Sequence, residues 1–103
     1  MENKTINVNG KVYKIPEIDF NAVCELEELG LDFSKMNKKT FSVGRILLAF
    51  VMNVSLEEAG KAYSKHSENN NNALNEIMIP LFNAVNESDF FQKTLKEGVK
   101  KSK

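Results

Sequence analysis

The sequence predicts a mainly α fold with a short N-terminal β-hairpin (α+β), in which the hairpin precedes a small bundle of four to five helices. Two observations predict this class. Alternating apolar residues flank Asn9-Gly10, and apolar residues recur at helical spacing through most of the later chain. A length of 103 residues suits a single domain with one modest core. We therefore expect one domain over 1–103, composed of a hairpin (5–15), a helical part (20–95) and a flexible basic tail (96–103).

The hairpin prediction depends on the Asn9-Gly10 dipeptide. This pair suits a type I′ turn, because both central positions of that turn need a positive φ angle. A two-residue turn places Val8 opposite Lys11, and side chains alternate between the two faces of each strand. The apolar face then consists of Ile6, Val8, Tyr13 and Ile15. Since an isolated hairpin is only marginally stable, this face is expected to pack on a helix or on a partner.

The first two helices are predicted by their ends and by their apolar spacing. Asp19 is a suitable N-cap for a helix over about 20–29, and Gly30 fits the left-handed position that ends it. A second helix is expected over about 41–53, and it is apolar on most sides. Such a helix is either central in its domain or in contact with another chain.

Two further helices follow. Ser55 and Glu58 form a capping-box pattern, which predicts a helix that ends near Ser67. The clearest helical period of the chain runs over 74–85, with Pro80 inside it. Because proline removes a backbone donor and its ring clashes with the preceding turn, we expect this helix to be kinked just before Pro80.

Composition excludes several functional classes. The chain has 14 basic and 14 acidic residues, and a net charge of zero argues against a general nucleic-acid or anionic-membrane binder. No apolar run is long enough to span a bilayer, and the N-terminus has no apolar stretch typical of a signal peptide. The single cysteine, Cys24, cannot form an intrachain disulfide, which favours a cytoplasmic protein.

No residue pattern indicates catalysis, a metal or a cofactor. His66 is the only histidine, and we interpret it as a surface residue near a helix end, because no further metal ligand stands at a recognisable spacing. Cys24 lies on the apolar face of its helix, which favours a buried thiol over a nucleophile. Phosphate-binding loops, nucleophile elbows and dinucleotide-binding motifs are missing from the sequence. We expect no enzymatic activity and no cofactor.

Arg45, the only arginine, and Glu27 each place a charge on a largely apolar helix. In one hypothesis Arg45 pairs with Glu27 or a neighbouring carboxylate inside the protomer. In another it pairs with a carboxylate of a second chain. The third interpretation is an exposed arginine whose aliphatic stem covers apolar surface. The sequence leaves all three open.

The apolar residues outnumber what short elements obviously need for internal burial. A last helix, capped by Ser88 or Asp89, adds more of them near the end of the chain. Either these side chains close the core of the monomer, or they form a surface for self-association or for capture of a partner helix. The candidate surface comprises Leu48, Met52, Arg45, Phe90, Phe91 and Leu95. On the second interpretation, exposed or interfacial positions in an isolated protomer are predicted for Leu48, Met52, Phe90 and Phe91.

Three segments carry a resemblance to a known family. They are IPEIDFNAVCELEELG at 15–30, LEEAGK at 56–61, and ESDFFQ at 87–92 together with Leu95. In this order, and following the hairpin, they resemble the small tail assembly chaperones of siphovirus-type bacteriophages and of prophages of Gram-positive bacteria. The resemblance extends over most of the chain, and its motifs are not catalytic.

The resemblance implies a non-enzymatic chaperone that binds the tape-measure protein and keeps it soluble during tail morphogenesis. It also implies a homo-oligomer in the cytoplasm of the bacterial host that is missing from the mature virion, with the tail tube protein as a second candidate partner. One alternative is a structural head–tail or minor tail protein. A less favoured alternative is a small helical nucleic-acid-binding regulator, against which the glutamates of the helix after Ser55 argue.

Overall fold

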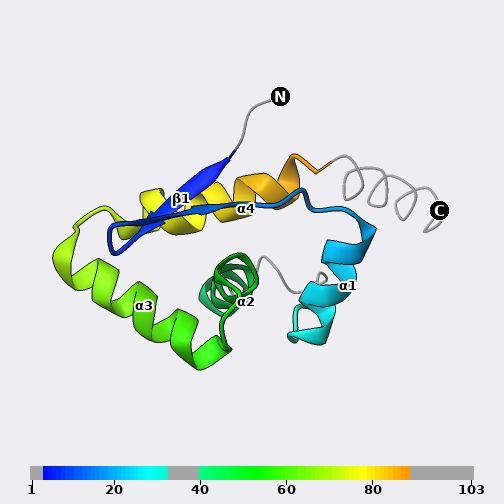
Figure 1. The fold of residues 1–103 in the computed structure, drawn as a ribbon, viewed down its shortest axis with the longest axis horizontal. Coiled ribbons are helices and arrows are strands. Elements are labelled where there is room, and N and C mark those ends of the chain that lie inside the picture. Colours follow the sequence, from blue (N-terminus) through cyan, green and yellow to red (C-terminus); the bar gives the residue numbers. More distant parts are fainter. Residues whose placement is uncertain (1–3, 33–39, 89–103) are drawn as a thin grey trace.

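The computed structural model describes residues 4–32 and 40–88, and it confirms the mainly helical α+β class. A two-stranded hairpin lies across a group of helices in which α2 has a middle position (Figure 1). The elements are β1 (Thr5–Val8), β2 (Lys11–Lys14), α1 (Phe20–Glu28), α2 (Thr40–Met52), α3 (Leu56–Asn69), the π-helical η2 (Leu74–Met78) and α4 (Ile79–Asn86). The last predicted helix and the basic tail (96–103) fall outside the described residues.

The hairpin has the predicted register, with antiparallel strands and Val8 opposite Lys11. Asn9 and Gly10 have φ angles of 56° and 87°, as a type I′ turn requires. Strand β1 contacts α3 and η2. On the predicted apolar face, the buried side chains are Ile6, Val8 and Ile15, and Tyr13 is partly buried. The expected packing of this face against helices is therefore confirmed.

The predicted helix caps are also confirmed. The Asp19 carboxylate accepts a hydrogen bond from the backbone N–H of Ala22 at 3.0 Å, at the start of α1. At the start of α3, the Ser55 hydroxyl accepts from the N–H of Glu58 at 3.1 Å, and the Glu58 carboxylate accepts from the N–H of Ser55 at 3.3 Å. Gly30 ends the first helical segment with a φ angle of 108°. These signals were readable because each depends on neighbours in the sequence.

Helix α2 is the central element, since it contacts α1, α3, α4 and β2. Leu48 exposes 0% of its surface, so the expectation that Leu48 belongs to an exposed surface is wrong. Because elements pack on several sides of α2, burial extends well beyond a single apolar stripe. Met52, near the end of the helix, is only partly buried. The buried residues of α2 are Val43, Gly44, Ile46, Leu47, Leu48 and Ala49.

A sharp turn connects α2 to α3. Asn53 takes the left-handed conformation with a φ angle of 60°, and the N–H of Val54 donates to the carbonyl of Ala49 at 3.1 Å. The two helices are bent by 102° relative to each other, and they pack together. No single helix within 4–32 and 40–88 is long and apolar enough to cross a membrane, and α2 with α3 reaches that length and apolar character only as a bent pair.

The helix before Pro80 changes its hydrogen-bond pattern at the position where the sequence predicts a kink. Residues 74–78 form a π-helix, in which the N–H of Ile79 donates to the carbonyl of Leu74. Helix α4 then begins, with Pro80 in its first turn. Proline has no N–H to donate to the carbonyl four residues earlier, at Glu76, and its ring excludes that carbonyl from its normal position. A wider π turn accommodates this gap, so a π-helix is found at the position of the predicted kink.

Candidate partner-binding surface

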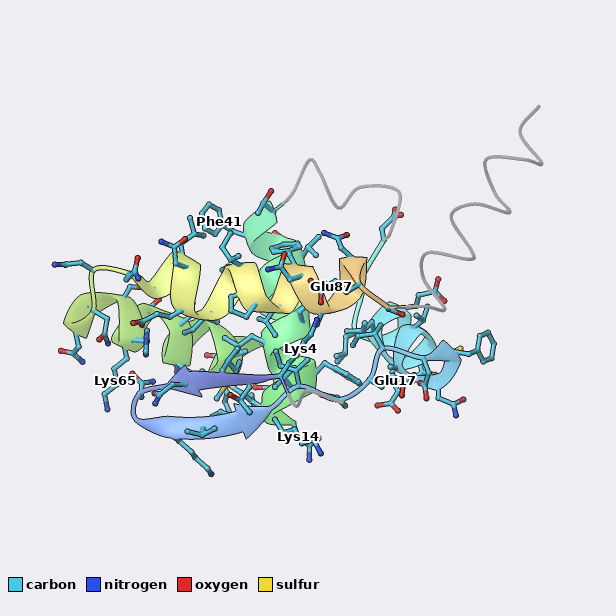
Figure 2. The ribbon with its side chains drawn as sticks, turned by 90° about the horizontal axis from the view of Figure 1, so that it is seen from above. Lys4, Lys14, Glu17, Phe41, Lys65 and Glu87 are labelled. Carbon is cyan, nitrogen blue, oxygen red and sulfur yellow. The ribbon has the colours of Figure 1, made fainter. Side chains whose placement is uncertain are left out.

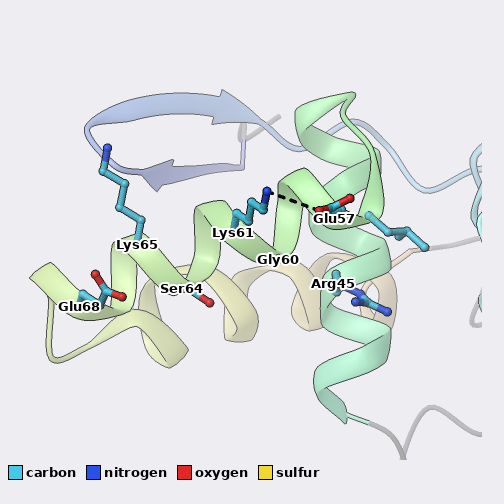
Figure 3. Close-up of a pocket in the computed structure, with 8 residues that line it drawn as sticks. Arg45, Glu57, Gly60, Lys61, Ser64, Lys65 and Glu68 are labelled. Atoms are coloured by element: carbon cyan, nitrogen blue, oxygen red, sulfur yellow. Dashed lines mark ion pairs between the residues drawn. The ribbon is translucent and has the colours of Figure 1, made fainter.

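Two adjoining depressions lie on the surface of α2 and α3. The larger, of about 680 Å³, is lined mainly by charged and polar side chains, and the smaller, of about 260 Å³, mainly by apolar ones. Both include Arg45 and Gly60, so we treat them as one surface, the Arg45 depression, of which Figure 3 shows the larger part. The larger part is also lined by Leu56, Glu57, Lys61, Ser64, Lys65 and Glu68. The smaller part is completed by Phe41, Ser42, Ala59, Tyr63 and Met78.

Arg45 is exposed, and its guanidinium forms no ion pair or hydrogen bond with any residue in the described ranges. The aliphatic stem of Arg45 packs against α3 beside Gly60. Its Cδ atom lies 3.5 Å from the position that a Cβ atom would take at Gly60. Glu27, an exposed residue of α1, is not its partner. Among the described residues, the hypothesis of a pair inside the protomer is therefore wrong. Pairing with a second chain stays a prediction.

The charged part of the depression has more positive than negative groups. Its cations are Arg45, Lys61 and Lys65, and its anions are Glu57 and Glu68. Lys61 and Glu57 form an exposed pair, with 3.4 Å between Nζ and Oε2, which contributes little to stability. Figure 3 shows Lys61 and Lys65 directed toward the hairpin side of α3, whereas Arg45 lies on the other side of that helix. Arg45 is thus the cation closest to the apolar part.

The large exposed apolar side chains differ from those expected. Phe41, at the start of α2, is 66% exposed and borders the apolar part of the depression. Phe90, Phe91 and Leu95 of the predicted surface lie outside the described residues. The available signal for Phe41 was its position at the start of the helix, ahead of the buried run that begins at Val43. The other large exposed apolar residues within the described ranges are Val12, Phe20, Leu74 and Ile79.

His66 is a buried connector, so its interpretation as a surface histidine is wrong. The residue is only 3% exposed, because the hairpin packs on α3 at this point. The backbone N–H of Asn9 donates to Nδ1 of His66 at 3.0 Å, and Nε2 lies 2.7 Å from a carboxylate oxygen of Glu76. Since Nδ1 accepts a hydrogen bond, the ring proton is on Nε2 and is donated to Glu76. His66 therefore joins the hairpin turn, α3 and η2.

Groups suited to chemistry are sparse in the described part of the chain. Within 4–32 and 40–88, no three His, Cys, Asp or Glu side chains converge as metal ligands. Cys24 is a free, partly buried thiol on α1. The Arg45 depression and its apolar border are therefore the candidate functional surface. Comparison of the chain with protein-family models, curated proteins and solved structures finds no match.

Proposed function

We propose that this chain is a non-enzymatic tail assembly chaperone, which binds the tape-measure protein of a long-tailed phage or prophage and keeps it soluble. The ordered resemblance of 15–30, 56–61 and 87–92 suggests the family. The structural observation that supports it is a depression with an exposed aromatic residue, Phe41, and a cation, Arg45, that has no partner within 4–32 and 40–88. Such a surface suits another polypeptide better than a small substrate.

The physical requirements of this role are modest. A tape-measure protein is long and prone to form coiled coils, so its helices expose apolar stripes that aggregate when left uncovered. A chaperone for such stripes needs apolar surface and contacts weak enough to be released when the tail tube assembles. Several copies bound along one target gain affinity from avidity, without a large contact area for each copy. We accordingly propose a homo-oligomer in the host cytoplasm, with the tail tube protein as a second contact.

Co-expression tests this proposal. The chain is produced together with the tape-measure protein of the same phage or prophage genome, and the soluble fraction of that protein and its co-purification are measured. We expect solubility to rise and the two proteins to co-purify. A parallel culture that expresses an unrelated small helical protein is the control. A tape-measure protein that stays insoluble with both partners contradicts the proposal.

The content of purified virions separates a chaperone from a structural tail protein. We expect mass spectrometry to detect this chain in infected or induced cells and not in purified particles, because a chaperone leaves before the tail is complete. The tail tube protein in the same particles is the internal control. A constant copy number per virion would favour the structural alternative.

A further inference from the structure

We propose that the Arg45 depression is a docking site for a single amphipathic helix that carries an acidic side chain beside its apolar stripe. This inference rests on the proposed function, since it identifies where this chain receives a tape-measure helix and which side chains that helix presents.

The apolar part of the depression combines an exposed aromatic side chain with a buried methionine. Phe41 is 66% exposed at its border, and Met78 is 3% exposed at its base. Tyr63 adds a partly buried ring. Aromatic anchors beside a concave surface are typical of the few residues that dominate binding energy at interfaces. A methionine side chain adapts to several apolar shapes, which suits successive turns of a long, variable helix.

Arg45 determines the charge that the occupant must carry. Its guanidinium has no partner among the described residues, and it stands where the charged and apolar parts meet. Because its stem packs beside Gly60, the charged group is held next to the apolar part. A guanidinium binds a carboxylate through two parallel hydrogen bonds. The complementary helix therefore places Asp or Glu directly beside its apolar residues, as coiled-coil helices do next to their core positions.

The dimensions fit one helix. Helix α3 has 14 residues, which corresponds to a length of about 20 Å. The charged part of the depression follows α3 from Leu56 to Glu68. A bound helix of three to four turns covers a surface of this length, so each copy of the chain engages a short segment of its target. Such small contacts are reversible individually and gain strength when repeated.

A designed peptide provides the direct test. The probe is a fluorescently labelled amphipathic helix of about five turns, with a leucine stripe flanked by glutamates, and the full chain is titrated into it. We expect Arg45→Glu to weaken binding by about tenfold or more. The control is Lys14→Glu, the same reversal of charge on the exposed strand β2; Figure 2 shows Lys14 and Phe41 at opposite sides of the molecule. Equal affinities for the two variants would overturn the proposal.

A charge-swapped peptide separates direct pairing from a loss of folding. Replacement of the flanking glutamates by lysines is expected to weaken binding to the wild-type chain and to restore it in Arg45→Glu. Phe41→Ser tests the apolar contact. We expect it to lower the affinity for both peptides by the same factor. If Arg45→Glu binds neither peptide while its unfolding midpoint matches that of the wild type, Arg45 does not face the peptide and the proposal fails.

Nuclear magnetic resonance distinguishes the possible occupants. We expect the peptide to shift the amide signals of Phe41, Gly60 and Met78 and to leave that of Val12 unchanged. Shifts of the same three signals with protein concentration, without peptide, would assign the depression to a second copy of this chain and overturn the proposal. Nuclear Overhauser contacts from Phe41 to residues 89–103 in the free monomer would assign it to the chain's own C-terminal segment, with the same consequence.

The same variants distinguish a wrong docking site from a wrong chaperone function. If the wild-type chain and Arg45→Glu both keep the tape-measure protein soluble, the chaperone function stands and the docking site is wrong. If the wild-type chain fails with the tape-measure protein but binds the peptides as expected, the docking site stands and the chaperone function is wrong.

Discussion

His66 connects three elements through its two ring nitrogens. Asn9 donates to one of them, and the other donates to Glu76. We expect His66→Ala to lower the free energy of unfolding by about 1–3 kcal/mol, because the buried imidazole and its hydrogen bonds to Asn9 and Glu76 are lost. The urea midpoint of unfolding measures this loss. Ser67→Ala removes an exposed hydroxyl one position along α3 and is expected to change stability by less than about 0.5 kcal/mol. Equal midpoints for the two variants would contradict the connecting role.

The tautomer of His66 is a second prediction at this scale. The acceptor role of Nδ1 requires the neutral ring to carry its proton on Nε2. In mildly alkaline buffer, long-range proton–nitrogen correlation spectra of the ring are expected to show an unprotonated Nδ1 and a protonated Nε2. A proton on Nδ1 would be incompatible with the hydrogen bond from Asn9.

The interpretation of His66 from the sequence failed for a physical reason. Burial of its ring depends on a hairpin turn that is remote in the chain but docked in space, and a local pattern carries no information about that docking. The caps at Asp19 and Ser55 were predicted correctly because their partners lie three residues away. The sequence draws attention to Arg45 as the only arginine, but its surroundings depend on how α3 packs on α2.

Helix α2 contains residues that stabilise the fold and a residue that we propose contacts the partner. Leu48 is completely buried in this helix, whereas Phe41 in its first turn is largely exposed. We expect Leu48→Ala to cost about 2–5 kcal/mol of unfolding free energy, because it leaves a cavity in the centre of the protein. Phe41→Ala is expected to cost less than about 1 kcal/mol. Denaturant unfolding of both variants measures the difference. A small effect of Leu48→Ala would contradict the central position of α2.

The capping box of α3 allows a similar comparison between two serines. Ser55→Ala removes the acceptor for the N–H of Glu58 and is expected to destabilise the protein by about 1 kcal/mol. Ser64→Ala changes the same residue type within the exposed helix, where alanine is the better helix former, and is expected to be neutral or slightly stabilising. Thermal unfolding followed by circular dichroism distinguishes them. The opposite order of stabilities would contradict the cap.

Elements were predicted better than their mutual arrangement. The hairpin and the helices follow from period, turn residues and caps, which are properties of neighbouring residues. The sequence predicts a kink before Pro80 and not a π-helix, because the missing donor identifies the position of the irregularity but not its form. The burial of Leu48 followed from packing on several sides of α2, which the apolar stripe of one helix does not reveal.

For the whole molecule, self-association is the remaining prediction. A protein that coats a long target in many copies is expected to associate weakly with itself, since neighbouring copies lie side by side. Sedimentation velocity over increasing concentration measures this, and we expect the average mass to rise above that of one chain. Lysozyme at the same concentrations controls for non-ideal behaviour. A strictly monomeric boundary at the highest concentration would argue strongly against the coat.

Side-chain contacts connect the N-terminal part of the described chain to the residues after α4. Lys4 forms an ion pair with Glu87, and the hydroxyl of Ser88 donates to the carbonyl of Ile18; Figure 2 shows Lys4 and Glu87 close together. A ribosome makes the hairpin before α2, α3 and η2, which are the helices that contact it. The apolar face of the hairpin therefore stays uncovered until α3 and η2 have left the exit tunnel.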